Sequence, residues 1–316
     1  MKKLLLALFL GSMLYSSSTQ AQEFSLSQFY TSPLSLNPAF TGLVNGQYRV
    51  TGNYRSQFGD VSLGQQTFGA SFDIPFNKFG IGIWAHNSSK GEFNNTSANI
   101  SAAYHIKLDD RGFNRLSFGV QGGAVQKSLG DLIFVDPTDI PAVTSTLNPD
   151  INAGLMYYNT SIFNVINPFL GASVYHIIEG AESFVNSTVE PFILERTINV
   201  YGGFQFNQKR TFDIVPQALV SLTGRNTRIS VGAVTHYFLK DADASVLLGS
   251  HFRLNEAVSV EGGIQYGDFA FGLSYDVNFS PLSRAINGGN DGFEISLIYI
   301  KKKRIKNNRD KICPRL

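Results

Sequence analysis

The sequence has one cysteine, few charges and a single long apolar run, and each shortage excludes a class of protein. Cys313 is the only cysteine among 316 residues, which excludes an internal disulfide framework and a cysteine-based zinc site. A helical membrane protein needs repeated apolar runs of about 20 residues, and the one such run stands at the N-terminus. Intrinsic disorder is excluded because 43% of the residues are hydrophobic and the formal net charge is only +2.

Aromatic residues and glycine are abundant instead. The chain has 26 Phe, 13 Tyr and 30 Gly, yet its mean hydropathy of −0.02 shows no overall apolar excess. A chain of this length can form two average soluble domains or one large sheet closed on itself. The composition favours the sheet.

The N-terminus has the pattern of a secretory signal. Lys2 and Lys3 precede an apolar stretch over residues 4–14, and small residues follow as far as Ala21. We expect residues 1–21 to be removed, so that the mature protein begins near Gln22. The alternative is a lone membrane anchor, but the stretch is too short to span a bilayer comfortably.

From residue 47 onward the dominant period is two. In residues 47–58 the even positions include Tyr48, Val50 and Tyr54, whereas the odd positions include Arg49 and Arg55. Successive side chains of a strand point to opposite faces, so this pattern predicts a strand between an apolar and a polar medium.

Comparable segments recur along the chain, fourteen in all. They cover residues 47–58, 67–76, 79–89, 93–108, 115–128, 150–162, 168–178, 196–207, 211–223, 227–239, 244–254, 257–266, 269–279 and 291–301. Most are longer than soluble strands and suit strands that cross a membrane at a tilt.

The connections between these segments support the same architecture. The three longest gaps, at about 129–149, 179–195 and 280–290, all follow an odd-numbered segment. Long loops at one end and short turns at the other are typical of outer-membrane barrels. We therefore predict an all-β, antiparallel transmembrane barrel of about 14 strands over residues 47–301, in the outer membrane of a Gram-negative bacterium.

The residues on either side of this barrel are expected to be separate elements. Residues 22–46 are predicted to be an ordered but irregular periplasmic segment. Residues 302–316 form a basic tail, which is either a docking element for a partner or anionic lipid, or a solvated end that keeps the last strand in water.

A soluble β-sandwich is the alternative fold. Small and polar residues on one face, such as Gly80, Gly82 and Ser117, suit a crowded or wet lumen, while Phe79 and Ile81 opposite them suit lipid. A closed barrel also satisfies every backbone group, a condition that hydrocarbon imposes and water does not.

Several ionisable residues are predicted to face the lumen. By alternation these are Arg49, Arg55, Asp73, His86, Arg228, Arg253, Glu261, Asp276 and Glu294. Arg253, Asp276 and Glu294 come from the eleventh, thirteenth and fourteenth segments, close enough across the sheet that we expect an ion-pair network. This network is either a charge ladder that holds the barrel closed or a polar surface that grips an exported segment or a plug.

Two short motifs stand out near the start of the barrel: Gln28-Phe29 followed by Asn-Pro-Ala-x-x-Gly at residues 37–42, and Tyr-Arg-x-Gln at residues 54–57. They resemble motifs of the PorP/SprF membrane proteins of the type IX secretion system, which occur in gliding and secreting Bacteroidota. The resemblance covers about residue 24 to the C-terminus, although Phe58 and Phe293 depart from the usual Trp and His. The matching positions are Gln28, Asn37, Pro38, Gly42, Tyr54, Arg55, Gln57, Gly249, Arg253, Ser274, Tyr275, Asp276 and Glu294.

The resemblance implies a non-enzymatic barrel that assists the export or surface display of cargo proteins such as gliding adhesins. Outer-membrane lipid, other type IX secretion components, secreted cargo and a periplasmic peptidoglycan-binding protein are the implied partners, and nucleic acid is not among them. The alternative function is a porin-like channel for small solutes or hydrophobic compounds.

No catalytic, metal or cofactor site is expected. The five histidines lie on five different segments, and the chain has neither a Gly-x-Ser-x-Gly nor a His-Glu-x-x-His motif. The sequence therefore predicts a protein that is not an enzyme.

Overall fold

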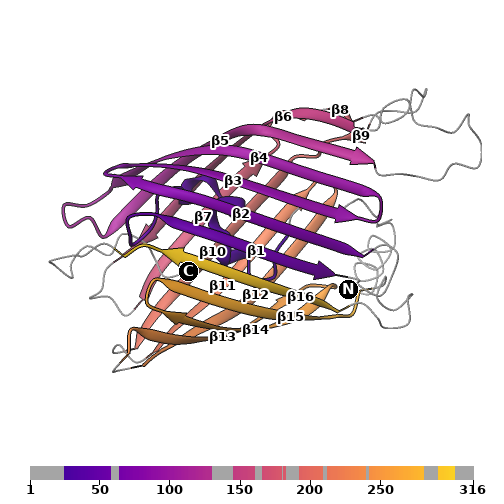
Figure 1. The fold of residues 1–316 in the computed structure, drawn as a ribbon. Helices are drawn as coiled ribbons and strands as arrows, with labels where there is room; N and C mark the ends of the chain where they lie inside the picture. The colour runs from indigo at the N-terminus through magenta and orange to yellow at the C-terminus, as the bar shows by residue number, and fades with distance from the viewer. Residues whose placement is uncertain are drawn as a thin grey trace, which may run out of the picture.

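Fourteen antiparallel strands close into a single barrel (Figure 1). The computed structural model describes residues 25–57, 64–129, 145–160, 166–179, 181–182, 192–208, 212–239, 242–280 and 291–302. Successive strands pair along the chain, except that β7 pairs with β10, and β1 closes the barrel by pairing with β16. The predicted all-β barrel of about 14 strands is confirmed.

The barrel strands match the alternating segments closely. They are β1 Arg49–Gln57, β2 Gln65–Phe76, β3 Phe79–Lys90, β4 Phe93–Lys107, β5 Asn114–Leu129, β6 Ser145–Asn159, β7 Ile166–Tyr175, β10 Thr197–Gln208, β11 Phe212–Thr223, β12 Asn226–Phe238, β13 Ala244–Arg253, β14 Ala257–Tyr266, β15 Phe269–Asn278 and β16 Gly292–Ile300. The largest shift in a boundary is at β6, which begins five residues earlier than predicted. A separate two-stranded sheet joins β8 Ala181–Glu182 to β9 Phe192–Ile193.

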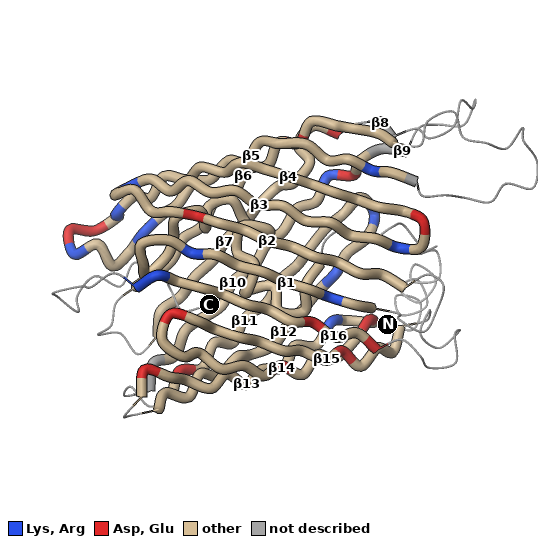
Figure 2. Tube along the Cα trace, viewed as in Figure 1, with Lys and Arg blue, Asp and Glu red and all other residues tan. Residues whose placement is uncertain are grey.

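The period of two sorts the side chains as predicted. Along β3 every second residue is exposed on the outer wall, including Phe79, Ile81 and Ile83, while the residues between them are buried. Charged residues gather toward the two ends of the barrel (Figure 2). The middle of the outer wall is thus an apolar band, which hydrocarbon requires.

In the described part of the chain before the barrel there are three short helices: the 3-10 helix η1 Phe29–Thr31, the α-helix α2 Pro33–Leu36 and the 3-10 helix η2 Pro38–Phe40. Across the described ranges, no helix is long and apolar enough to cross a membrane.

The antiparallel topology places the three longest predicted connections at one end of the barrel, which we call the outer end. These connections follow β5, β7 and β15. The opposite end, the inner end, includes the turn between β2 and β3. Most residues of the three long connections, the predicted signal and nearly all of the basic tail lie outside the described residues.

Candidate functional site

The lumen of the barrel is filled by the chain's own N-terminal segment. We call residues 25–46 the plug; its backbone lies inside the barrel (Figure 1, indigo). Most of its side chains are buried. At the outer end Arg228 Nη1 donates to Ser25 Oγ at 2.6 Å. At the inner end the backbone N–H of Gln47 donates to the carbonyl of Lys301 at 2.7 Å. The plug therefore runs the length of the lumen.

This position corrects the prediction of a periplasmic segment over residues 22–46 for residues 25–46; residues 22–24 lie outside the described residues. Phe29, Leu34, Phe40 and Leu43 are among the plug's apolar side chains, and each is at most 7% exposed. In the periplasm they would face water, whereas the lumen buries them at a gain of roughly 1.5–3 kcal/mol per large side chain. The frequency of large apolar residues in the segment is the sequence feature that could have indicated a buried position.

The outer part of the plug lies against buried ion pairs between wall strands. Arg55 of β1 and Arg253 of β13 both reach Asp276 Oδ2 of β15, at 2.7 and 2.9 Å. Arg55 also pairs with Glu294 of β16 at 3.2 Å. These four side chains are at most 3% exposed. The structure thus brings together Arg253, Asp276 and Glu294, as expected from sequence, and adds Arg55.

Ser27 of the plug lies at the centre of these charges. Its hydroxyl donates to both carboxylate oxygens of Asp276 at 2.7 and 2.8 Å, and it accepts a hydrogen bond from Arg253 at 2.6 Å and another from Arg55. The backbone N–H groups of Ser27 and Gln28 donate to the two oxygens of Glu294 at 2.7 and 3.1 Å. The network therefore binds the plug as well as linking the strands.

Two further residues extend this network toward the outer end. Glu256, in the turn after β13, accepts from Arg228 at 3.0 Å and pairs with Arg253 at 3.3 Å. Burial raises the pKa of Glu256, but Arg228, Arg253 and Arg55 outweigh burial and hold it below its usual range. We call Arg55, Arg228, Arg253, Glu256, Asp276 and Glu294 the ion cluster; it brings together three guanidinium and three carboxyl groups.

The middle of the plug is held by amide and hydroxyl groups. Asn37 Nδ2 lies 3.0 Å from the carbonyls of Leu155 and Ala172 and 3.1 Å from the Tyr201 hydroxyl. Its Oδ1 accepts from the backbone N–H of Ala39 at 2.7 Å, which caps η2, and Pro38 supplies the first residue of that helix. Asn37 thus connects the plug to two strands and one aromatic side chain.

Wall side chains satisfy the plug carbonyls in the same region. Ser117 donates to the Ala39 carbonyl at 2.6 Å, and Ser173 donates to the Leu36 carbonyl at 2.7 Å. A short helix leaves its last carbonyls without partners, and leaving a buried carbonyl unpaired costs about 1–3 kcal/mol. The polar residues predicted for the lumen wall therefore serve the backbone of the plug.

The inner part of the plug is held by Arg49 and Asp73. Arg49 Nε and Nη2 each donate to one oxygen of Asp73 at 2.9 Å, a bidentate pair, and Nη2 also donates to the Phe40 carbonyl at 3.2 Å. The backbone N–H of Gly42 donates to Asp73 Oδ2 at 2.8 Å. This pair again links β1 and β2 to the plug.

One sector of the lumen wall is apolar, which the sequence reasoning missed. The plug packs Leu36, Ala39, Phe40 and Leu43 against this sector, and Phe40 stacks on Tyr201 with ring centroids 5.7 Å apart. The wall residues in the cluster are Met156, Tyr158, Phe169, Tyr201, Val215 and Val234. Their strands carry apolar side chains on both faces. This weakened alternation over β6 to β12 is the sequence feature that could have indicated an apolar sector of the lumen wall.

The remaining predicted residues have other surroundings. Glu261 accepts from the Tyr30 hydroxyl at 2.8 Å and lies 2.7 Å from His251 Nδ1, so it holds the plug outside the ion cluster. His86 faces the lumen beside Trp84. Gln57, Gly249 and Ser274 also lie on lumen-facing positions, whereas Tyr54 and Tyr275 lie on the outer wall next to Phe293 and Asp291.

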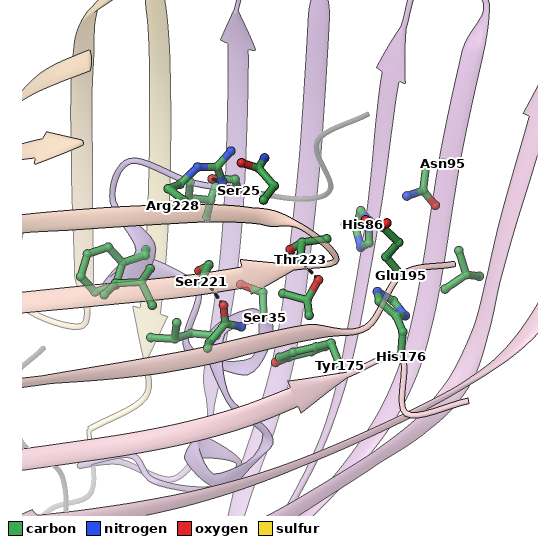
Figure 3. A pocket seen from close by; sticks show the side chains of 18 of the residues that line it. Ser25, Ser35, His86, Asn95, Tyr175, His176, Glu195, Ser221, Thr223 and Arg228 are labelled. Carbon is green, nitrogen blue, oxygen red and sulfur yellow. Dashed lines mark hydrogen bonds between the residues drawn. The ribbon is translucent and has the colours of Figure 1, made fainter. Parts of the chain in front are cut away.

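A cavity of about 120 Å³ remains between the plug and the outer part of the wall (Figure 3). Its floor includes Leu26, Phe29 and Leu36 of the plug. The wall contributes mainly hydroxyl, amide and imidazole side chains from strands β3, β4, β7 and β10 to β12. We call this space the vestibule.

A closed fourteen-strand antiparallel barrel with an apolar outer band and a lumen filled by its own N-terminal segment is an outer-membrane β-barrel protein. Solved structures of outer-membrane channels share the fold. The CymD monoaromatic hydrocarbon channel superposes with a TM-score of 0.52 at 12% identity, over 91% of this chain and 96% of that chain. A deletion mutant of the TodX monoaromatic hydrocarbon channel superposes with a TM-score of 0.51 at 12% identity, over 90% of this chain and 96% of that chain. A FadL homologue of Pseudomonas aeruginosa superposes with a TM-score of 0.50 at 11% identity, over 83% of this chain and 92% of that chain.

The family is given by the sequence itself. Residues 18–299 match the family described as type IX secretion system membrane protein PorP/SprF, and the chain belongs to that family. None of the curated proteins matches the chain. Most of the positions that carried the resemblance line the lumen or lie in the plug, among them Asn37, Gly42, Arg55 and Asp276.

Proposed function

We propose that this protein is a non-enzymatic component of type IX secretion that helps exported proteins, such as surface adhesins, reach or remain on the cell surface. The observation that carries the proposal is the plug. It occupies the lumen from the outer to the inner end and is held by hydrogen bonds to many strands, some of them to ion-paired side chains of the wall. A lumen filled in this way is suited to a scaffold or receptor.

The alternative is a channel for small solutes or hydrophobic compounds. Its support is the likeness to the hydrocarbon channel CymD and to TodX. That likeness, at 12% identity, concerns the fold. For a solute to pass, the plug would have to leave or rearrange, which would expose its apolar side chains and break its hydrogen bonds to the ion cluster and to Asp73.

A clean deletion of the gene separates the two functions. If the proposal is right, specific surface proteins disappear from the outer face of the cell while the uptake of small solutes and hydrocarbons is unchanged. An unchanged set of surface proteins together with altered solute uptake would overturn the proposal and support the channel.

The partners implied by the family are part of the same proposal. We expect the tagged protein, purified from its own outer membrane, to retain other type IX secretion components and a periplasmic peptidoglycan-binding protein. A strain that carries the untagged protein controls for adventitious binding. Recovery of the barrel alone under mild detergent conditions would contradict this part of the proposal.

A further inference from the structure

The vestibule is closed at its base and charged at two positions of its wall. Apart from two histidines, the charged residues that line it are Glu195 and Arg228. Arg228 is already paired with Glu256 at 3.0 Å and bonded to Ser25. Glu195, which is half-buried just before β10, therefore supplies the charge available to a ligand.

Besides apolar and aromatic side chains such as Val125 and Leu219, the wall presents neutral groups that both donate and accept hydrogen bonds. These are the hydroxyls of Thr197, Ser221 and Thr223 and the amides of Asn95, Asn199 and Asn226. Ser221 and Asn199 bond each other at 2.6 Å, and Thr197 and Thr223 at 2.8 Å, so they form paired rows on neighbouring strands. Figure 3 shows several of these side chains directed toward the cavity.

We propose that the vestibule binds an extended segment of an exported polypeptide, with a cationic side chain of that segment placed against Glu195. The inference rests on the proposed function and assigns it a site. A polypeptide backbone presents alternating N–H and C=O groups, which the mixed donors and acceptors of the wall can bind. The apolar floor of Leu26, Phe29 and Leu36 accommodates an apolar side chain of the same segment.

Other ligand classes fit the vestibule less well. A hydrocarbon would remove water from the hydroxyl and amide groups without replacing its hydrogen bonds. A polyanion would need more than one cation, and Arg228 is neutralised by Glu256. A carbohydrate would need an exposed ring for stacking, but Trp84 and Tyr175 are only 5% and 6% exposed.

The ligand enters and leaves by the outer mouth, because the plug stays in place beneath it. Removing the plug would break three sets of hydrogen bonds at once. These are the bonds to the ion cluster, the bonds that Asn37 makes to the wall, and the bond from Gly42 to Asp73. Thr41 of the plug and Ser101 of β4 offer a way to test this, since their hydroxyl oxygens are 2.9 Å apart. Cysteines at these two positions are close enough for a disulfide that holds the inner part of the plug in the lumen.

The first experiment fills the vestibule. Ser221→Trp places a large ring in the cavity, and Leu222→Trp places the same ring one residue away on the lipid-facing wall, where Leu222 is 39% exposed. Both variants replace the chromosomal gene, and heat-dependent gel mobility confirms the folded barrel. We expect S221W to reduce the surface proteins that depend on this gene at least tenfold, and L222W to leave them unchanged.

The second variant changes charge without changing volume. Glu195→Gln should lower display of the same proteins several-fold. This variant tests the proposal even if S221W fails to fold. Normal display in E195Q overturns the role of Glu195. Normal display in a folded S221W overturns the vestibule as the binding site.

The third experiment tests whether the plug stays seated. In a Cys313→Ser background, Thr41→Cys with Ser101→Cys should form a disulfide and retain wild-type display. Loss of display in the oxidised double variant, restored by reduction, would show that the plug must leave the lumen. That result would overturn the inference that the ligand binds above a plug that stays in place.

These outcomes are distinguishable from failure of the proposed function. If the gene deletion itself leaves the surface proteins intact, the secretion role is wrong. If the deletion removes them and S221W does not, the secretion role stands and the vestibule is wrong. Reduced hydrocarbon uptake in S221W with intact surface proteins would assign the cavity to a small apolar ligand instead.

Discussion

Gly42 of the plug and Gly80 of β3 are in backbone contact. A Cβ atom built on Gly42 would stand 2.4 Å from the Gly80 Cα, and one on Gly80 would stand 2.1 Å from the Thr41 carbonyl oxygen. Gly42 also has a φ of +71°, in the left-handed region that favours glycine. The inner part of the plug can therefore approach the wall only because both residues lack a side chain.

Gly80→Ala should loosen the plug while leaving the barrel closed. The added methyl group meets backbone, which cannot move aside cheaply, so we expect a loss of about 1–3 kcal/mol. Hydrogen exchange at residues 38–44 and the urea midpoint of the purified barrel would measure it. The matched control is Gly52→Ala, where a Cβ meets nothing within 4 Å. Equal exchange in the two variants would contradict the close approach.

Asp276→Asn should be strongly destabilising. Arg55 and Arg253 both depend on Asp276, and loss of its charge leaves two buried guanidinium groups compensated only by Glu294 and Glu256. Removing one partner of a buried ion pair typically costs about 3–5 kcal/mol.

The control for D276N is Asp243→Asn. The Asp243 side chain is 71% exposed and pairs with Lys302, so the loss there should stay within about 1 kcal/mol. Urea unfolding in detergent, monitored by heat-dependent gel mobility, would compare the unfolding midpoints of D276N and D243N. Similar midpoints for D276N and D243N would show that the ion cluster does not stabilise the barrel.

Asn37→Asp should release the middle of the plug. The substitution keeps the shape of the side chain but replaces both N–H donors with an oxygen, which then faces the carbonyls of Leu155 and Ala172. Each buried group left unpaired costs about 1–3 kcal/mol. We expect residues 33–43 to become accessible to protease, whereas Asn87→Asp, at an exposed pair with Thr96, should leave them protected. Full protection in N37D would rule out Asn37 as an anchor.

Acid should weaken the outer end through Glu256. Its pKa in the folded barrel is held below the unfolded value of about 4.3 by Arg228, Arg253 and Arg55. The interaction is therefore fully present above that value and is lost as the pH falls through the depressed pKa.

Wild type and Glu256→Gln measured in parallel would test this pH dependence. The difference between the urea midpoints of wild type and E256Q should be steady from about pH 6 to 8 and shrink below about pH 5. E256Q should start lower and fall less over the acid range. Parallel curves for the two proteins would show that Glu256 does not titrate in this way.

The plug shows where prediction from sequence succeeded and where it did not. Alternation placed Arg55, Arg253, Asp276 and Glu294 on the lumen side, because the period of two is a local property of each strand. It did not show that Ser27 would lie among them, because that contact joins residues separated by 249 positions. The apolar sector around Tyr201 was missed for the same reason: its partner Phe40 comes from outside the barrel strands.

The sequence by itself determined the strands, their faces and the closed barrel, because side-chain alternation and the demand of hydrocarbon for paired backbone groups act along every strand. Only the tertiary structure decided what occupies the lumen. Residues 25–46 have no regular period, and their place depends on apolar area, glycine-sized gaps and buried charges that come together only once the strands have closed around them.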